Sequence, residues 1–369
     1  MATAVEHSVV GEMSGEQRVS IGMDVGGSLA KFVLFEEPEE GTDGSSSRHP
    51  LEDYIRKAVA SEARSADRSS LPEGWFAQAI RPGSSQGSND DERQDSTALY
   101  ALRLPTSDLP ELFNRVGAQN AGDLRLRVAA TGGGTLKFKA ELEEQLRVEI
   151  AFVHELKAIA RGLPKVAGQR PSPALLCSVG TGVSLIHISD SNGGFERVSG
   201  SGIGASTFWN LARRLTSYTD FEAAVTQPGD AQKVDVLVGD VYGVETSREI
   251  GMPPELVAGF LGKLGAPGVA DRDVVAALLR MFTNNLGQLA VFQARLLELS
   301  EVWFCGGCFG ASEADEGSGA GRVVRRAVAD AVGFWSAGKV KALFPGNASF
   351  LGAVGAATEA SNSGSSKEQ

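Results

Sequence analysis

Three glycine-containing segments, far apart along the chain, have the composition of turns that bind phosphate groups. They are Asp24-Val25-Gly26-Gly27-Ser28, Gly180-Thr181-Gly182 and, after Phe304-Cys305, Gly306-Gly307. Each follows an apolar run, and glycine lets backbone N–H groups close around phosphate oxygens that a Cβ atom would keep away. A single such turn is equally well explained as an ordinary hairpin with a permissive glycine. Three of them in this order favour a site for the phosphates of a nucleotide.

Two charged residues beside the first turn extend this chemistry to phosphoryl transfer. Asp24 supplies one carboxylate, and Mg²⁺ prefers few carboxylates and keeps much of its water, so Asp24 is expected to hold Mg²⁺ through water. Lys31 follows the turn and is expected to neutralise charge on the phosphoryl group that is transferred. The chain has no Gly-x-x-x-x-Gly-Lys-Ser/Thr segment, which argues against a P-loop nucleotide site.

The turns require strands on either side, and the hydrophobic pattern supplies these strands in two similar halves. In the first half we expect two strands within 18–36, further strands at 98–104 and 124–130, and helices at 107–116, 136–146 and 151–162. In the second half we expect strands at 174–179, 183–188 and 301–304, and helices at 207–215, 276–299, 323–336 and 351–359. The order of strand, glycine turn and strand thus occurs twice.

This order is that of the actin-like ATPase fold, in which two duplicated RNase H-like α/β lobes close over ATP and each contributes a phosphate hairpin. We therefore predict a two-lobed α/β protein of this fold. Its expected parts are a polar tail at 1–17, an N-terminal lobe at 18–165, a C-terminal lobe at 166–360 and a Ser-rich tail at 361–369. Within the first lobe, 37–96 is expected to be a flexible insert with a short helix near 51–63. The last helix is expected to pack back on the first lobe.

Composition argues against several other classes of protein. The 369 residues carry 46 acidic and 35 basic side chains, a net charge of −11, which argues against general nucleic-acid binding. Three cysteines cannot build a disulfide framework, and Cys305-x-x-Cys308 lacks the further ligands of a zinc site. No apolar run approaches the roughly 20 residues of a membrane span, and no secretory signal core is present. We therefore expect a cytoplasmic protein with no membrane span.

Longer strings make a resemblance to one family specific. In chain order they are 22–29, 130–134 with 137–138, 155–156, 180–184, 195–198, 233–235, 240–243, 283–287, 334–336, 341–344 and 352–356. Together they resemble the eukaryotic-type (type II) pantothenate kinases, a family of the actin-like ATPase superfamily. They extend from about residue 19 to residue 358 and leave out the insert at 37–96.

The resemblance implies ATP-dependent phosphorylation of the primary hydroxyl of pantothenate to 4'-phosphopantothenate, the first step of coenzyme A synthesis. Glu155 matches the family's catalytic carboxylate, and a carboxylate there would accept the hydroxyl proton. Arg197 matches a residue that contacts pantothenate near the reacting centre, Ser184 a substrate-contacting serine, and Val257-Ala258 a stretch that lines the pantothenate site. The residues expected to contact ATP are Asp24, Gly26, Gly27, Ser28, Lys31, Gly180, Thr181, Gly182, Gly204, Ser206, Thr207, Gly306 and Gly307.

The resemblance also implies partners. A homodimer is expected, in which the partner contributes to the substrate tunnel and the helix region around Phe334-Trp335 helps to form the interface. A heterodimer with a paralogue is the alternative. Coenzyme A or one of its thioesters is expected to act as a feedback inhibitor at the same site.

Three departures from the family pattern concern the site. Gly204-Ala205-Ser206 stands where the family has three glycines, and either narrows the approach of the nucleotide or places Ser206 as the cap of the following helix. His154 replaces an acidic residue, and an arginine is missing after Gly306-Gly307. These departures leave two alternatives open. One is a weakly active or regulatory subunit that pairs with an active paralogue, and the other is a kinase of the same superfamily that acts on a sugar or another small alcohol.

Overall fold

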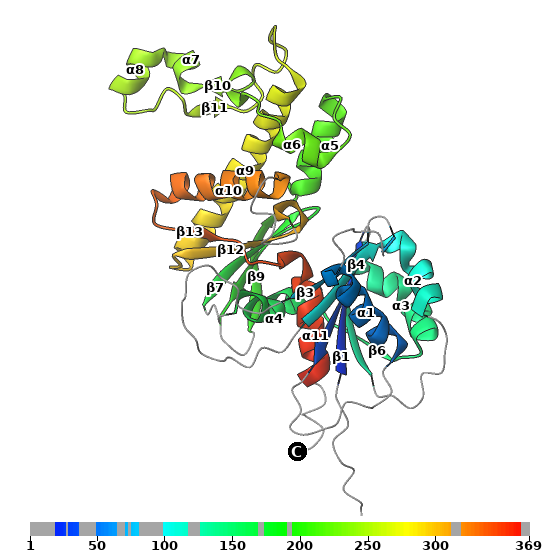
Figure 1. Ribbon diagram of the computed structural model, residues 1–369. Coiled ribbons are helices and arrows are strands. Elements are labelled where there is room, and N and C mark those ends of the chain that lie inside the picture. Colours follow the sequence, from blue (N-terminus) through cyan, green and yellow to red (C-terminus); the bar gives the residue numbers. More distant parts are fainter. Residues whose placement is uncertain are drawn as a thin grey trace, which may run out of the picture.

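Two β-sheets with packed helices form the body of the protein (Figure 1). The computed structural model describes residues 19–26, 29–36, 49–64, 71–72, 75–80, 99–116, 126–168, 173–189, 194–310 and 319–362. Gly27 and Ser28 of the first turn therefore lie outside the described residues. The tail predicted at 1–17 and residues 363–369 of the second tail also lie outside them.

The first sheet has the strand order β3-β4-β2-β1-β5-β6. Its strands are β1 (Val19–Val25), β2 (Leu29–Glu36), β3 (Phe76–Ile80), β4 (Leu99–Pro105), β5 (Arg127–Thr131) and β6 (Ile150–Phe152). β2 runs antiparallel to β1 and β4, whereas β5 runs parallel to β1 and β6. β1 is buried along almost its whole length, as expected for a central strand that is covered on both faces.

The second sheet repeats this arrangement with the order β13-β12-β7-β8-β9. Its strands are β7 (Ala174–Val179), β8 (Val183–Ile188), β9 (Phe195–Ser201), β12 (Glu301–Cys305) and β13 (Lys341–Leu343). β8 runs antiparallel to β7 and β9, whereas β12 runs parallel to β7 and β13. Strands β4-β2-β1-β5-β6 thus correspond in order and direction to β9-β8-β7-β12-β13. This duplication confirms the predicted two-lobed fold of the actin-like ATPase type.

Helices pack on both sheets. The first lobe has α1 (Pro50–Arg64), the single turn η1 (Thr106–Asp108), α2 (Leu109–Val116), α3 (Gly133–Leu146) and α4 (Glu155–Ala167). The second has α5 (Ala205–Leu215), α6 (Phe221–Thr226), α9 (Asp271–Leu296), η3 (Gly307–Phe309), α10 (Ala320–Ser336) and η5 (Ala348–Phe350). Of the helices in the described ranges, α9 alone is long and apolar enough to cross a membrane, and 61% of its most apolar stretch is buried inside the protein. That burial is typical of a core helix.

The segment 37–96, expected to be a flexible insert, supplies two elements to the first lobe. The helix expected near 51–63 is present as α1, and β3 adds an edge strand that the polar composition did not predict. Leu51, Ile55, Trp75 and Ala77 are buried in the core of this lobe. A few apolar residues at the right spacing therefore order these parts of a segment whose average composition is polar.

The chain before α4 is a strand rather than the start of a helix. The sequence predicts one helix from 151 to 162, but Ile150–Phe152 pairs with β5 as β6, and α4 begins at Glu155. Ile150 is buried at the edge of the sheet, and apolar residues there favour pairing over a further helical turn. Glu155 is consequently the first residue of its helix.

The C-terminal helix α11 (Leu351–Asn362) packs on the first lobe against β1 and α4 (Figure 1). Glycines make this packing very close. A Cβ atom at Gly22 of β1 would lie 1.9 Å from the carbonyl oxygen of Ala353, and one at Gly355 would lie 1.7 Å from that of Ala158 on α4. The backbones of the three elements are therefore in direct contact.

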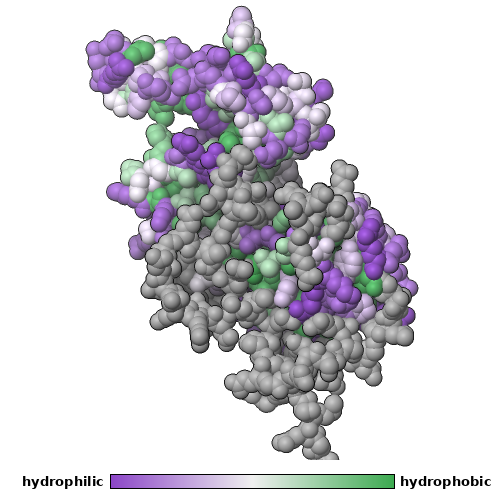
Figure 2. Space-filling model, in the orientation of Figure 1, coloured by the Kyte–Doolittle hydropathy of each residue, from purple (hydrophilic) through white to green (hydrophobic). Residues whose placement is uncertain are grey.

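Residues 227–270, between α6 and α9, project from the second lobe and are called the arm (Figure 1). The arm contains η2 (Ala231–Lys233), β10 (Val236–Leu237), α7 (Val238–Tyr242), α8 (Val244–Glu249) and β11 (Val257–Gly259), and β10 pairs with β11. Figure 2 shows that the face of the arm turned to the viewer is mainly hydrophilic.

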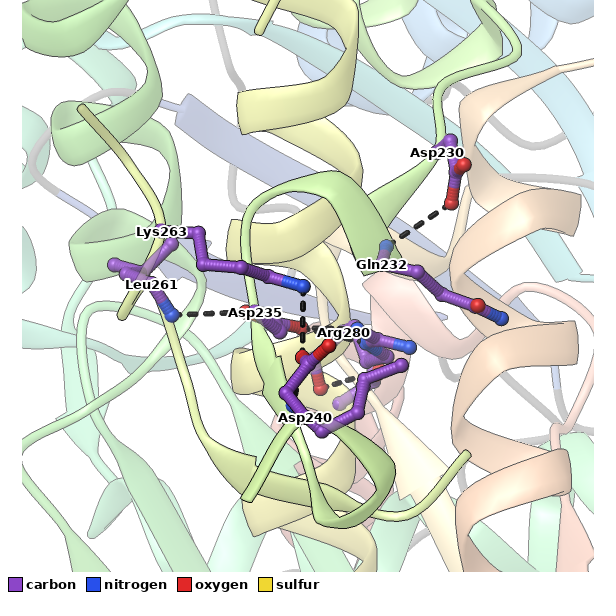
Figure 3. Close-up of polar contacts among 9 residues, drawn as sticks. Asp230, Gln232, Asp235, Asp240, Leu261, Lys263 and Arg280 are labelled. Carbon is purple, nitrogen blue, oxygen red and sulfur yellow. Dashed lines mark hydrogen bonds and ion pairs between the residues drawn. The ribbon is translucent and has the colours of Figure 1, made fainter. Parts of the chain in front are cut away.

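Carboxylates fasten the arm to itself and to α9 (Figure 3). Asp235 is fully buried and accepts hydrogen bonds from Nε and Nη2 of Arg280 on α9 and, at 2.8 Å, from the N–H of Leu261. Asp240 accepts a hydrogen bond from Nζ of Lys263 at 2.8 Å. The string at 233–235 therefore attaches the arm to α9, whereas Asp240 stabilises the arm internally.

Candidate active site

The first glycine turn connects β1 to β2 and carries an ion pair at its base. Asp24 and Lys31 are paired in the register of these strands, and Lys31 Nζ donates to Asp24 Oδ2 at 3.0 Å. Each side chain is 19% exposed, so the pair is accessible from one side. The hydroxyl of Thr106 donates to the Gly26 carbonyl at 3.0 Å and holds the turn against η1. The structure thus brings the two predicted phosphate-directed charges together.

The glycines at the start of α3 pack against the backbone of this turn. The sequence alone did not reveal this contact. A Cβ atom at Gly134 would lie 2.7 Å from the Val25 carbonyl oxygen and 2.8 Å from that of Gly26. Gly132 has φ +89°, and a Cβ atom there would lie 2.5 Å from the Val25 carbonyl oxygen. The sequence feature that could have predicted this contact is the glycine run Thr131-Gly132-Gly133-Gly134. A hollow of about 510 Å³, lined by Gly26, η1 and the start of α3, lies beside the turn.

The second glycine turn connects β7 to β8 and contacts the loop before α5. The N–H of Gly180 donates to the Gly182 carbonyl at 2.8 Å, which closes the turn. A Cβ atom at Gly204 would lie 2.5 Å from the Thr181 carbonyl oxygen and 2.7 Å from that of Gly180. Only glycine therefore fits at position 204, and the chain keeps glycine there.

The altered loop 204–206 is compatible with this contact. Gly204 is the N-cap of α5, Ala205 is the first residue of the helix and Ser206 the second. The proposal that Ser206 caps the helix is therefore wrong, since no side chain caps it. The hydroxyl of Thr207 donates to the Gly202 carbonyl at 3.3 Å and so fixes the loop. The two extra Cβ atoms stand in the first turn of a helix, after the position where the backbones touch.

The third glycine turn follows β12 and packs on the end of β7. Gly306 has φ +143°, and a Cβ atom there would lie 1.9 Å from the Val179 carbonyl oxygen. Gly307 begins η3 and has open space around it. The three predicted segments of the second lobe, at 180–182, 204–207 and 306–307, therefore lie around the carboxyl end of β7.

Electrostatics link this group of turns to the first lobe. Burial raises the pKa of the Cys305 thiol to about 12, while a hydrogen bond with Ser178 and the positive charge of Lys31 act in the opposite direction. Lys31 belongs to β2 of the first lobe and Cys305 ends β12 of the second. The charged base of the first turn therefore faces the end of the second sheet.

Glu155 begins α4 within electrostatic range of the Asp24–Lys31 pair. Loss of surrounding water raises the pKa of Glu155, the negative charge of Asp24 raises it further, and the positive charges of Lys31 and His154 lower it. The ring of His154 stacks on that of Phe195 with 6.3 Å between centroids, which connects the start of α4 to β9. A carboxylate with a raised pKa beside a lysine is a typical general base, since its affinity for a proton is increased.

Arg197 and Ser184 meet on the second sheet. Arg197 Nε donates to Ser184 Oγ at 3.3 Å, and both belong to the exposed side of β9 and β8 near the second turn. A Cβ atom at Gly200 would lie 2.1 Å from Nη2 of Arg197. The guanidinium group therefore occupies space that a side chain at position 200 would fill. Arg197 lies two residues after Phe195, whose ring contacts His154. Arg197 therefore lies on the strand that the start of α4 contacts, and Ser184 lies on the neighbouring strand.

The predicted site residues Val257 and Ala258 lie apart from the others. They belong to β11 in the arm, which Figure 1 shows well away from the two glycine hairpins. Within one chain the structure therefore does not bring them to Glu155. Their assignment to the pantothenate site therefore stays a prediction.

The donor atoms present fit magnesium rather than a tightly bound transition metal. In the ranges that the structure describes, no group of three or more His, Cys, Asp and Glu side chains could hold a metal ion. Asp24 offers one carboxylate, which suits an Mg²⁺ ion that takes its other ligands from phosphates and water. Cys177, Cys305 and Cys308 are free thiols, and burial raises the pKa of each.

The chain is similar to proteins of one family. The Fumble family model matches residues 20–171 and 163–359. Pantothenate kinase 2 of Oryza sativa subsp. japonica is 29% identical over 364 residues, 91% of this chain and 38% of that protein. Pantothenate kinase 1 of Arabidopsis thaliana is 32% identical over 265 residues, 64% of this chain and 67% of that protein.

A further relative bears a different name. The 4'-phosphopantetheine phosphatase of Mus musculus is 32% identical over 259 residues, 62% of this chain. The chain spans 38% of the length of the rice protein and the match covers 30% of the mouse protein. Since the family model covers both lobes, the chain belongs to the Fumble family, that of the type II pantothenate kinases.

Proposed function

We propose that the chain transfers the γ-phosphoryl group of ATP to the primary hydroxyl of pantothenate and forms 4'-phosphopantothenate, the first step of coenzyme A synthesis. The observation that carries the proposal is the position of Glu155. Its carboxylate interacts electrostatically with both Asp24 and Lys31 at the first glycine turn. The names of the plant relatives support the choice of acceptor.

The glycine turns hold the triphosphate in this proposal. The N–H groups of Gly26 and Gly180 close their own turns, so other backbone N–H groups of the turns at 180–182 and 306–307 bind the phosphate oxygens, and the loop at 204–207 supports the second turn. Lys31 neutralises charge that develops on the transferred group. Asp24 is the residue that would hold Mg²⁺ through water, and the ion would supply further charge neutralisation at the β- and γ-phosphates.

Glu155 acts as the general base. Its carboxylate accepts the proton of the primary hydroxyl as the hydroxyl oxygen forms a bond to the γ-phosphorus and the bond to ADP breaks. Arg197 and Ser184 hold the acceptor so that this hydroxyl faces the phosphate. Arg197 is exposed on β9 and Ser184 is partly exposed on β8, where a bound molecule can reach them.

Three further properties complete the proposal. The protein is a homodimer, or a heterodimer with a paralogue, in which the arm brings Val257 and Ala258 to the partner's acceptor site. Coenzyme A or an acyl thioester inhibits it by binding at this site. The protein is cytoplasmic, which the three free thiols support because such thiols persist in a reducing compartment.

The pH dependence of turnover tests the tuning of Glu155. Replacing His154 with alanine removes a positive charge that lowers the pKa of Glu155, so that pKa rises. Because a general base must be ionised, we expect the acid limb of the kcat profile to move to higher pH, with little change on the alkaline side. The profile is measured by a coupled ADP assay for wild type, His154→Ala and, as a control histidine on β8, His187→Ala. If the acid limb of the His154→Ala profile has the same midpoint as that of wild type, His154 does not influence the general base.

Two other functions have specific support. The altered loop at 204–206 and the missing arginine favour a weakly active or regulatory subunit. The fold is also compatible with a kinase for a sugar. We separate them by supplying the purified chain with MgATP and either pantothenate or glucosamine, alone and with a catalytically active paralogue. We expect phosphorylation of pantothenate by the chain alone. Turnover that needs the paralogue would show the regulatory subunit, and turnover of the sugar alone would show the sugar kinase.

A further inference from the structure

The carboxylate of Asp24 stands between two glycines from different elements. A Cβ atom at Gly132, before α3, would lie 2.8 Å from Oδ1, and one at Gly352 on α11 would lie 3.0 Å from Oδ2. Oδ2 is also the atom that accepts the hydrogen bond of Lys31 at 3.0 Å. The absence of both side chains therefore sets the width of the space that the carboxylate occupies.

Other contacts prevent α11 from moving away from Asp24. Glu359 on α11 forms ion pairs with Lys157 at 2.6 Å and with Arg161 at 3.1 Å, both on α4. The backbone of α11 at Gly355 lies directly against the carbonyl of Ala158 on α4. A side chain at position 352 would consequently displace the carboxylate rather than the helix.

We propose that Gly352 is a positioning residue, which by lacking a side chain lets the Asp24 carboxylate stand where it pairs with Lys31 and faces the phosphates. The inference rests on the proposed function, in which these two residues act on the triphosphate. Gly352 lies in a helix, where alanine needs no unusual backbone conformation. Gly132 has φ +89°, so a substitution there would also strain the backbone. Position 352 therefore tests the carboxylate alone.

The test is Gly352→Ala in the full chain. We expect a thermal midpoint close to that of wild type and a Kd for a non-hydrolysable MgATP analogue at least about tenfold higher, because a hydrogen bond to a charged group is weakened. We also expect half-maximal turnover to need more Mg²⁺. The matched control is Gly333→Ala on α10, where an added Cβ meets nothing within 4 Å and should change neither quantity. Calorimetric titration measures the binding without reference to the acceptor.

A double-mutant cycle distinguishes displacement of the Asp24 carboxylate from a change in the packing of the whole lobe. In an Asp24→Ala background the two atoms nearest the new methyl group, Oδ2 and Cγ, are gone, and Cβ at 3.4 Å makes only an ordinary contact, so Gly352→Ala should then change the Kd by less than about twofold. Equal losses in both backgrounds, or wild-type binding by Gly352→Ala, would overturn the inference. If Gly352→Ala does not fold, the double variant with Asp24→Ala decides the question. Recovery of folding in the double variant supports steric displacement of the carboxylate, and no recovery overturns the inference. A wild type that binds MgATP but leaves pantothenate unchanged would refute the proposed function while the cycle still decides the role of Gly352.

Discussion

Glu155→Gln is expected to lower kcat for pantothenate phosphorylation by a factor of about 10²–10⁴, which is the usual contribution of a general base. The amide has the size of the carboxylate but does not accept a proton from the acceptor hydroxyl. Because Glu155 is the first residue of α4 and is not buried, the substitution should leave the fold and the KM for MgATP nearly unchanged. Initial rates at saturating MgATP measure the effect.

Glu149→Gln is the matched control for this experiment. Glu149 is an exposed glutamate that precedes β6, whereas Glu155 follows it, so the two lie toward opposite ends of the same strand. We expect Glu149→Gln to retain wild-type kcat. A loss of less than tenfold in Glu155→Gln would mean that the hydroxyl proton is accepted elsewhere.

Asp235→Ala is expected to lower the free energy of unfolding by about 3 kcal/mol, because removing one partner of a buried ion pair leaves the other without compensation. Asp235 is fully buried, whereas Arg280 is 27% exposed and keeps some contact with water, so the lower end of the usual range applies. The N–H of Leu261 also loses its acceptor. Urea denaturation measures the change, and hydrogen exchange should show faster exchange within 227–270.

Arg248→Ala provides the comparison within the arm. Arg248 and Glu245 form an exposed ion pair at 3.8 Å with exposures of 62% and 87%, and such pairs contribute less than about 1 kcal/mol. The two substitutions therefore remove an ion pair of the same segment in opposite environments. Equal effects of Asp235→Ala and Arg248→Ala would show that the contact with α9 does not hold the arm.

The hairpins of the site were predictable from sequence because their signals are local. An apolar strand, a glycine turn and a second strand define β1 with β2 and β7 with β8, and the repeat of this order predicts the duplicated fold. Asp24 and Lys31 fall opposite each other as soon as the hairpin register is known. Glu155 and Arg197 were found only through the family resemblance, since a lone glutamate or arginine carries no local signal.

The remaining parts of the site depend on contacts between distant segments. Gly204 and Gly352 are required because backbone or a carboxylate from another element approaches them, and neighbouring residues do not reveal such an approach. β3 was missed because its apolar residues lie within a polar segment, and α4 was predicted to begin too early because the short strand β6 has no turn signal before it. Val257 and Ala258 follow the family motif, but the arm carries them away from their own chain's turns.

The structure of the full chain with Mg²⁺, a non-hydrolysable ATP analogue and pantothenate would test the central claim most directly. We expect the triphosphate between the turns at 24–28 and 180–182, and a carboxylate oxygen of Glu155 within about 2.6–3.2 Å of the primary hydroxyl of pantothenate. A nucleotide bound away from either turn, or a hydroxyl that contacts a different carboxylate, would contradict the proposed phosphoryl transfer.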